Sequence, residues 1–309
     1  MNLIVEEAHQ ATFAAMGNTV NVVVVGGNGE HVAWAHRRIA ELESRWSRFI
    51  ASSDISRMNR AEGRPIEVAS ETISLLQYMV DAHRITSGLF DPTRLPQLIA
   101  AGYQRSMVSE RLTILPKGVF WSHGLDDVVI DAGSRCVTLP PDVTIDAGGI
   151  GKGFAADIVA TEIIANGARG ALVNVGGDLR CMGEGDREGA WEIAIANPLG
   201  SGEIDRVRLH SGAVATSSLF AKTFERGNQR SSHLIDPRID RALSPVDSKV
   251  VQATVIAREC VWAEAFTKAV ILDEPRHGMA LIDGLDLAAL MVTDDGSIQG
   301  SSNWARFRA

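Results

Sequence analysis

The stretch 146-DAGGIGKGFAAD-157 decides how the middle of this chain folds. The residues 143-VTID-146 that lead into it predict a strand, and the glycines that follow predict a tight turn. A helix is then expected over 153–166, with Gly167 as its stop. The glycine turn, the helix N-terminus and the single cation Lys152 together suit a phosphate. The spacing matches neither GxGxxG nor GxxxxGK[ST], so phosphate binding and a packing turn both stay open.

Strands and helices alternate on both sides of this stretch. Four consecutive valines in 20-VNVVVV-25 favour a buried strand, and the apolar positions of 30–49 recur every three or four residues, which predicts an amphipathic helix. A second helix is expected over 70–88, with Ser70 as its N-cap. These elements and several hairpin-like pairs predict an α+β fold, with mixed β-sheets flanked by helices. The remaining expected elements are strands at 171–175, 191–196, 206–209, 250–257 and 287–292, a turn at 294–296 and a helix at 259–272.

The composition limits the class of protein. With 309 residues, of which 45% are hydrophobic, the chain can bury a real core, and we expect residues 1–309 to form a single domain with room for two closely packed lobes. The net charge of -8 argues against nucleic acid as a partner. Three separated cysteines indicate neither disulfides nor a zinc site. The start, MNLIVEEAHQ, lacks the basic and apolar regions of a secretory signal, and no stretch is long enough to span a membrane, so a cytoplasmic location is expected.

Four other clusters could carry chemistry, and each also has an ordinary structural interpretation. The segment 174-NVGGDLR-180 most simply predicts a tight turn. In 233-HLIDPR-238 the histidine is either a general base or a hydrogen-bonded residue beside a turn. In 86-TSGLFDPT-93 the aspartate can cap a loop or bind a ligand. Glu264 and Lys268 in 263-AEAFTKA-269 have the spacing of a surface ion pair, but their apolar neighbours suggest that these charges have a partner or a purpose.

Taken in order, these clusters resemble the FAD:protein FMN transferase family, the ApbE-type flavin transferases. Eight ordered motifs run from about residue 12 to residue 295. The resemblance implies an ApbE-like fold and an enzyme that splits the pyrophosphate of FAD, transfers FMN to a Ser or Thr hydroxyl of an acceptor protein and releases AMP. The matching motifs are 16-MGNTVNV-22, 46-WSRF-49 with 54-DISRMNR-60, 87-SGLFDPT-93, 146-DAGGIGKGFAAD-157, 174-NVGGDLR-180, 215-ATSS-218, 233-HLIDPR-238 and 263-AEAFTKA-269.

The resemblance also implies roles for individual residues. Lys152 offsets the pyrophosphate charge, His233 takes the proton of the acceptor hydroxyl, and Asp146 lies near the reaction centre. The alternative function is FAD binding, or FAD hydrolysis to AMP and FMN, without a protein acceptor. The implied FAD contacts are Met16, Phe49, Leu89, Phe90, Asp91, Asp146, Lys152, His233, Leu234 and Ile235.

The sequence departs from the family pattern at the magnesium site. The resemblance places the metal on the carbonyl of Gly149 and on an Asp and a Thr four residues apart, where this chain has Glu264 and Lys268. A charged lysine has no lone pair for a metal and repels it. Either the Lys268 ammonium takes the place of magnesium, or the metal binds nearby while Lys268 pairs with Glu264. A smaller departure lies in 236-DPRIDRA-242, where the family usually has Thr, Gly and Pro in place of Ile, Asp and Ala.

Overall fold

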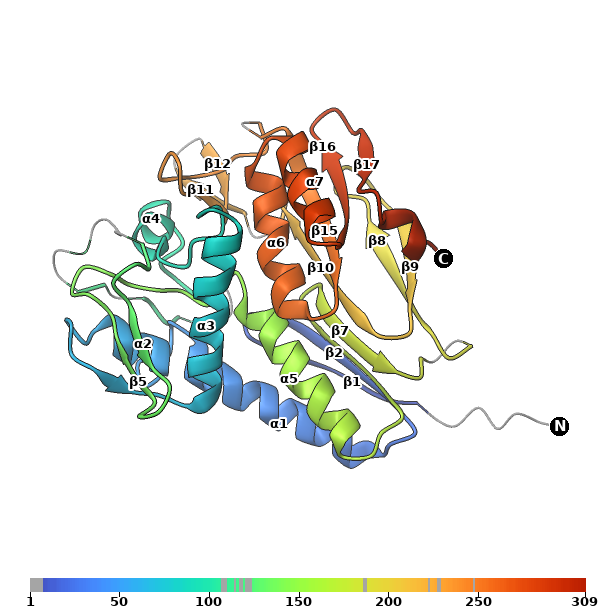
Figure 1. Ribbon diagram of the computed structural model, residues 1–309, viewed down its shortest axis with the longest axis horizontal. Coiled ribbons are helices and arrows are strands. Elements are labelled where there is room, and N and C mark those ends of the chain that lie inside the picture. The colour runs from blue at the N-terminus through green and yellow to red at the C-terminus, as the bar shows by residue number, and fades with distance from the viewer. Residues whose placement is uncertain are drawn as a thin grey trace.

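A large antiparallel sheet forms the centre of the molecule (Figure 1). The computed structural model describes residues 8–106, 110–113, 115–116, 119, 124–185, 188–221, 223–226, 229–246 and 248–309. Within this part of the chain, eight strands pair in the order β1-β2-β6-β7-β10-β15-β16-β17, and all neighbours are antiparallel. They are β1 (His9–Ala15), β2 (Asn18–Val25), β6 (Gly170–Val175), β7 (Asp178–Gly183), β10 (Gly212–Ser218), β15 (Val250–Ala257), β16 (Ala288–Thr293) and β17 (Ile298–Gly300).

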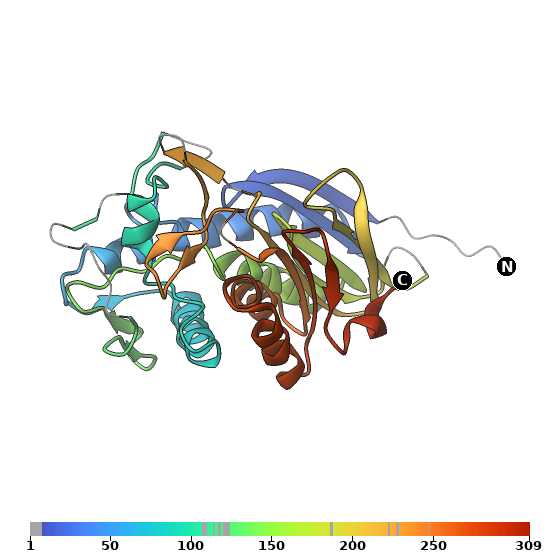
Figure 2. The same cartoon turned by 90° about the horizontal axis from the view of Figure 1, so that it is seen from above.

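Helices cover one face of this sheet (Figures 1 and 2). Helix α5 packs on β6 and β7, and α6 packs on β10 and β15. The main hydrophobic core lies between these helices and the sheet, and the expected apolar stripe of the first helix is buried in it. The helices are α1 (Gly29–Trp46), α2 (Asp54–Asn59), α3 (Ser70–Ile85), α4 (Leu95–Ala100), α5 (Gly151–Ala165), α6 (Cys260–Leu272) and α7 (Pro275–Gly284), followed by the 3-10 helix η1 (Trp304–Phe307).

The other face of the sheet is covered by a two-stranded ribbon. Strands β8 (Trp191–Ala196) and β9 (Glu203–Leu209) pair antiparallel, and Trp191 and Val207 are buried in a second core with residues of the main sheet. Trp304 of η1 closes this core, and its indole Nε1 donates a hydrogen bond to Asp205 Oδ2 at 2.7 Å. Because both faces of the sheet are covered, the interior strand β15 is buried along its whole length.

Shorter elements lie beside the sheet, on the left of Figure 1. Helices α2, α3 and α4 stand there with a small three-stranded sheet in the order β3-β5-β4. Two hairpins, β11–β12 and β13–β14, lie between α4 and the main sheet, and α4 contacts β14. The molecule thus has two parts, the main sheet with its helices and this group of shorter elements. The strands are β3 (Ile66–Glu67), β4 (Val129–Asp131), β5 (Cys136–Thr138), β11 (Thr223–Arg226), β12 (Gln229–Ser232), β13 (Ile235–Asp236) and β14 (Arg241–Ala242).

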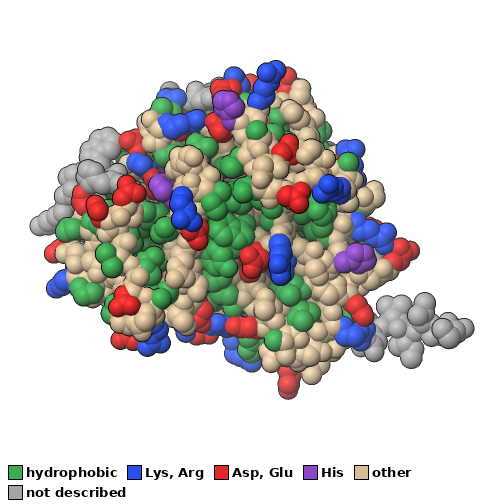
Figure 3. Space-filling view, viewed as in Figure 1, with side chains coloured by type: hydrophobic (Ala, Val, Ile, Leu, Met, Phe, Trp, Pro, Cys, Tyr) green, Lys and Arg blue, Asp and Glu red, His purple; other side chains and the backbone are tan. Residues whose placement is uncertain are grey.

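A row of aromatic rings joins the helices of the two parts. Phe154 of α5 stacks on Trp46 of α1 at 5.5 Å between ring centroids and meets Tyr78 of α3 at 5.1 Å. Tyr78 in turn contacts Trp262 of α6, which stacks on Phe266. Hydrophobic side chains gather over the middle of this face in the space-filling view (Figure 3). The row fixes α1, α3, α5 and α6 against one another through offset and edge contacts.

Two local predictions are wrong. Residues 143–146 form no strand, because the side chain of Asn59 takes over the hydrogen bonds of a sheet partner: it accepts from Ile145 N at 2.9 Å and donates to Ile145 O at 2.8 Å. Ser70 is the first residue of α3 and does not cap it. Asp54 of α2 instead accepts hydrogen bonds from Ala69 N and Thr72 Oγ1 at the start of that helix. The other predicted helices and strands of the main sheet are present.

Two findings concern the expectations about the cysteines and about membrane-spanning segments. Cys136, Cys181 and Cys260 carry free thiols, as the spacing predicts. Among the described residues, no helix has the length and apolarity needed to cross a bilayer.

Candidate functional site

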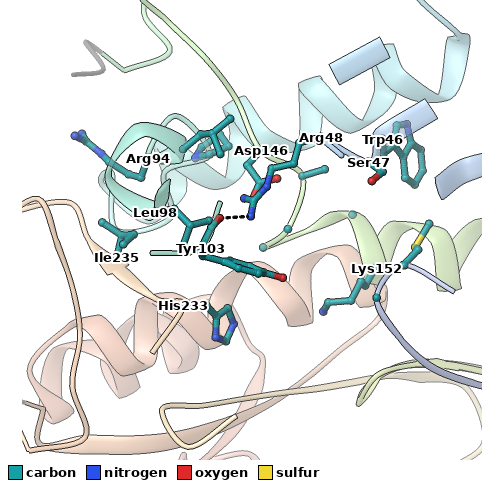
Figure 4. A pocket seen from close by; sticks show the side chains of 18 of the residues that line it. Trp46, Ser47, Arg48, Arg94, Leu98, Tyr103, Asp146, Lys152, His233 and Ile235 are labelled. Carbon is teal, nitrogen blue, oxygen red and sulfur yellow. Dashed lines mark hydrogen bonds and ion pairs between the residues drawn. The ribbon is translucent and has the colours of Figure 1, made fainter. Parts of the chain in front are cut away.

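A cavity of about 420 Å³ lies between the end of α1, the loop before α4, the glycine turn before α5 and the segment that leads into β13. Labelled side chains reach it from each of these elements (Figure 4). Tyr103 points toward its middle, with His233 and Lys152 on either side in this view. The structure brings together all ten residues that the resemblance implies for FAD, which are Met16, Phe49, Leu89, Phe90, Asp91, Asp146, Lys152, His233, Leu234 and Ile235.

Lys152 stands in the first turn of α5, directly after the glycine turn. Its ammonium forms ion pairs with Asp178 and with Glu264, whose Oε1 lies 2.7 Å from Nζ. Burial lowers the pKa of Lys152, but the two carboxylates outweigh this effect and hold the pKa above its ordinary value. Lys152 is therefore a fixed positive charge at the cavity wall.

Glu264 of α6 is fully buried and turns toward α5. Its Oε2 accepts a hydrogen bond from Gly153 N at 2.7 Å, while Oε1 faces Lys152. Burial raises the pKa of Glu264, but the ammonium groups of Lys152 and Lys268 outweigh it and hold the pKa below its ordinary value. The two helices approach closely at this point, because a Cβ on Gly153 would lie 2.4 Å from the carbonyl oxygen of Cys260. Glu264 does not line the cavity itself.

Lys268 follows one turn later on α6 and does line the cavity. Its Nζ donates to the carbonyl oxygen of Glu264 at 2.8 Å and lies 3.7 Å from Glu264 Oε1. Its Cε lies 3.6 Å from the position that a Cβ on Gly149 would take, so Lys268 stands directly against the glycine turn. Burial lowers the pKa of Lys268, although Glu264 and Asp178 act in the opposite direction. Glu264 and Lys268, which have the sequence spacing of a surface ion pair, are therefore buried.

Asp178 is a site residue that the sequence interpretation missed. It begins β7 after the turn formed by Gly176 and Gly177, which both have positive φ, so the predicted tight turn is present. The side chain is buried and one carboxylate oxygen faces Lys152, whereas Oδ1 has no hydrogen-bond partner within the described part of the protein. The motif 174-NVGGDLR-180 contained the residue, but no local pattern showed that its partner lies on α5.

Arg48 is the second missed residue and holds Asp146 in place. Its Nη1 lies 3.0 Å from Asp146 Oδ2, and its Nη2 donates to the carbonyl oxygen of Tyr103 at 2.9 Å. The guanidinium carbon lies 4.5 Å from the ring centroid of Phe49 and 4.6 Å from that of Tyr103. This buried arginine therefore orders two aromatic rings and one carboxylate of the cavity wall.

Asp91 lies in the wall but directs its carboxylate into the protein. Oδ1 accepts from the backbone N and the hydroxyl of Thr93, at 2.9 and 2.6 Å, and Oδ2 pairs with Arg94 Nε at 2.6 Å. Arg94 also pairs with Asp240, at 2.7 Å between Nη1 and Oδ1. The loop that carries Leu89 and Phe90 is thereby connected to the hairpin after His233.

His233 reaches the cavity from the segment between β12 and β13. The backbone around it is fixed on both sides: Ser232 N donates to Leu243 O at 2.7 Å, and Leu243 N donates to Leu234 O at 2.8 Å. The buried carboxylate of Asp236 pairs with Arg238 at 2.9 Å and so closes the following turn. The imidazole therefore lies at the cavity wall on a segment whose backbone is hydrogen-bonded on both sides.

Comparisons with known proteins agree with this architecture. The ApbE family model matches residues 16–291, and the chain belongs to the ApbE family. It is 26% identical over 271 residues to the FAD:protein FMN transferase of Vibrio cholerae, a match that covers 84% of this chain and 79% of that protein. A relative with the same description from Rhodobacter capsulatus is 32% identical over 243 residues, covering 77% of this chain and 45% of that protein.

Solved structures show the same fold. The crystal structure of an ApbE protein from Thermotoga maritima has a TM-score of 0.87 and 25% identity, and the match covers 98% of this chain and all of that one. The flavin transferase ApbE from Vibrio cholerae has a TM-score of 0.79 and 24% identity, with 97% of this chain and 100% of that chain covered. The predicted α+β, ApbE-like fold is therefore confirmed.

The side chains present do not provide the donor set that magnesium requires. Magnesium takes hard oxygen ligands in near-octahedral geometry. The oxygens of Glu264 face Lys152 and Gly153 N, Lys268 offers an ammonium, and the point between the carboxylates of Glu264 and Asp178 is taken by Lys152 Nζ. Within the described residues, no group of three or more His, Cys, Asp and Glu side chains could hold a metal ion.

Proposed function

We propose that this chain is an FAD:protein FMN transferase, which moves FMN from FAD to a Ser or Thr hydroxyl of a target protein and releases AMP. The observation that carries the proposal is that ten residues from widely separated parts of the chain, all implied to contact FAD, line one cavity. The relatives described as FAD:protein FMN transferases support it.

The proposed reaction is a phosphoryl transfer. The acceptor hydroxyl oxygen bonds to the FMN phosphorus, the bond from that phosphorus to the bridging pyrophosphate oxygen breaks, and the bridging oxygen leaves with AMP. His233 takes the proton of the attacking hydroxyl. Such reactions depend on positioning and charge stabilisation more than on covalent help from the protein. Lys152 supplies positive charge, and Asp146, oriented by Arg48, lies beside the glycine turn where the pyrophosphate would bind.

The proposal also covers the partner protein and the cellular location. The substrate is FAD, the partner is an acceptor protein with a Ser or Thr site, and we propose that the reaction takes place in the cytoplasm. We also propose that residues 1–309 act as one domain. Support for this comes from the main sheet, since the two hydrophobic cores lie on its opposite faces.

The test combines FAD binding with product analysis. The purified chain is incubated with FAD and a panel of Ser- and Thr-containing peptides, once with Mg²⁺ and once with EDTA. We expect a peptide with covalent flavin fluorescence and one AMP for each label. AMP and free FMN in equal amounts, with no labelled peptide, would identify an FAD hydrolase instead. A chain that binds no FAD under either condition would contradict both functions.

A further inference from the structure

Two ammonium groups and two carboxylates meet behind the glycine turn. Lys152 and Lys268, which both line the cavity, face Asp178 and Glu264. The side chains of Lys268, Asp178 and Glu264 are at least nine-tenths buried, and that of Lys152 is 16% exposed. The formal charges of the four groups cancel without any bound ion. A buried cluster that is neutral by itself has no carboxylate left over for a divalent cation to neutralise.

Lys268 is one of the two members of this cluster that line the cavity. Its Cε lies 3.6 Å from the position that a Cβ on Gly149 would take, and its Nζ donates a hydrogen bond to the carbonyl oxygen of Glu264 at 2.8 Å, which fixes the end of the side chain. The backbone amides of a glycine turn at a helix N-terminus suit a phosphate. An ammonium held against the same turn would meet the same anion.

We propose that Lys268 is the resident cation of the pyrophosphate subsite, so that this chain binds FAD without a divalent metal ion. The inference rests on the proposed function, because it assumes that the anion is the FAD pyrophosphate. A divalent ion at Gly149 would meet the positive charge of Lys268 at short range in a site sheltered from water, where repulsion is strong. The ammonium of Lys268 supplies the positive charge that binds the pyrophosphate there, and no metal ion is needed for it.

Direct metal binding tests the proposal without any reaction. Chelator-treated protein is mixed with Mn²⁺ in the presence and absence of FAD, and free Mn²⁺ is measured by electron paramagnetic resonance. In parallel, FAD affinity is measured from flavin fluorescence in EDTA and in Mg²⁺. We expect wild-type protein to leave the Mn²⁺ signal unchanged, and the dissociation constant for FAD to agree within about twofold between the two conditions.

Variants test the role of the side chain. Lys268→Met keeps an unbranched side chain that is one atom shorter and removes the charge, so FAD binding in EDTA should weaken by about ten- to a hundredfold. The double variant Glu264→Asp with Lys268→Thr places the Asp and Thr of the family pattern at these positions, and it should bind Mn²⁺ and gain at least about tenfold in FAD affinity from Mg²⁺. Lys249→Met is the matched control: Lys249 is an exposed lysine that pairs with Glu274 away from the cavity, and FAD binding should not change. Circular dichroism confirms that each variant is folded.

The outcomes separate this inference from the proposed function. One Mn²⁺ bound per wild-type chain, or loss of wild-type FAD binding in EDTA, would overturn the metal-free subsite while leaving the transferase intact. Unchanged FAD affinity of Lys268→Met in EDTA would also overturn it. If wild-type protein binds no FAD in either condition, the proposed function itself fails, and the inference fails with it.

Discussion

Arg94 and Asp240, which are 146 residues apart in the sequence, form an ion pair of 2.7 Å across the edge of the cavity. Arg94 also holds Asp91, so this pair connects the loop of Leu89 and Phe90 to the hairpin that follows His233. Asp240 has a φ of 52°, a conformation that normally favours glycine, and glycine is usual at this position in the family. This chain has an aspartate in that strained conformation, and its carboxylate connects the hairpin after His233 to the loop of Leu89 and Phe90, which form two walls of the cavity.

Asp240→Asn should therefore weaken FAD binding by about fivefold, because the two walls lose their ionic connection. The free energy of unfolding should change by less than about 1 kcal/mol, since the pair is partly exposed. Asp240→Gly is the control, because it removes the charge and also relieves the backbone. Equal losses of FAD affinity in the two variants would assign the effect to the carboxylate. An unchanged affinity in Asp240→Asn would refute the connection.

Asp157 should make stability depend on pH. Its carboxylate accepts hydrogen bonds from Cys260 N and Val261 N, both at 2.8 Å, at the start of α6. Burial raises its pKa from 3.8 to about 7, so the folded chain retains the proton at pH values where the unfolded chain has lost it. The stabilisation from this group is complete below about pH 4 and disappears as the pH rises to about 7.

The variant Asp157→Asn isolates this effect. The amide stays neutral and can accept only one of the two hydrogen bonds, so the variant should lose about 1–3 kcal/mol at pH 5. Its deficit relative to wild type should shrink as the pH approaches 7, because only the wild type carries the cost of ionisation. Urea unfolding of both proteins at several pH values measures this. A deficit that grows with pH would show that the pKa of Asp157 is lowered instead.

Glu264→Gln should be strongly destabilising. The amide oxygen can accept from Lys152 or from Gly153 N but not from both, and two ammonium groups would then share one buried carboxylate. Removing one partner of a buried ion pair costs about 3 kcal/mol or more. The double variant Glu264→Gln with Lys268→Met restores charge balance and should cost clearly less than the sum of the single changes. Strict additivity in urea unfolding would mean that the two residues are not coupled.

Gly153→Ala should force α5 and α6 apart. The added methyl would lie 2.4 Å from the carbonyl oxygen of Cys260, and neither backbone can move without disturbing the hydrogen bond from Gly153 N to Glu264. We expect a loss of at least about 2 kcal/mol. Gly29→Ala is the control, because Gly29 begins α1 with open space around it, and that change should be neutral or slightly stabilising. Thermal denaturation of both variants provides the comparison.

His233→Ala should lower the turnover of the proposed transfer by about a hundred- to ten-thousandfold, the usual contribution of a general base. FAD affinity should fall much less, because the hydrogen bonds of Ser232 and Leu243 hold this segment without the imidazole. Single-turnover formation of AMP and equilibrium binding of FAD separate the two effects. Equal losses in both would reassign His233 to binding.

Local patterns predicted the elements but not all of the contacts between them. Val20, Val22 and Val24 of β2 and the apolar stripe of α1 are buried, and each set repeats with the period of its element. The predicted strand at 143–146 failed because Asn59, a residue 86 positions from Ile145, provides its hydrogen bonds. No periodicity can reveal such a side chain.

The candidate site shows the same division. The motifs identified Lys152 and Lys268, yet the positions of both depend on Glu264, which looked like half of a surface pair and is fully buried. Asp178 and Arg48 were quoted within motifs and received no role, because their partners lie elsewhere in the sequence. A sequence motif identifies the residues of a site, but it does not show which charged residues from distant parts of the chain will pair with them in the folded protein.

The ion pair between Lys152 and Glu264 spans 112 residues and joins α5 to α6, while Asp178 adds the hairpin between them. These contacts have high sequence separation, so their loops must close before the cluster can form. A fragment that ends before α6 lacks Glu264, so we expect it not to form this wall of the cavity. A ligand that binds at this wall would therefore stabilise fully folded chains and not partly folded ones. FAD would then act as a pharmacological chaperone, and the melting temperature should keep rising with the logarithm of the free FAD concentration above the dissociation constant.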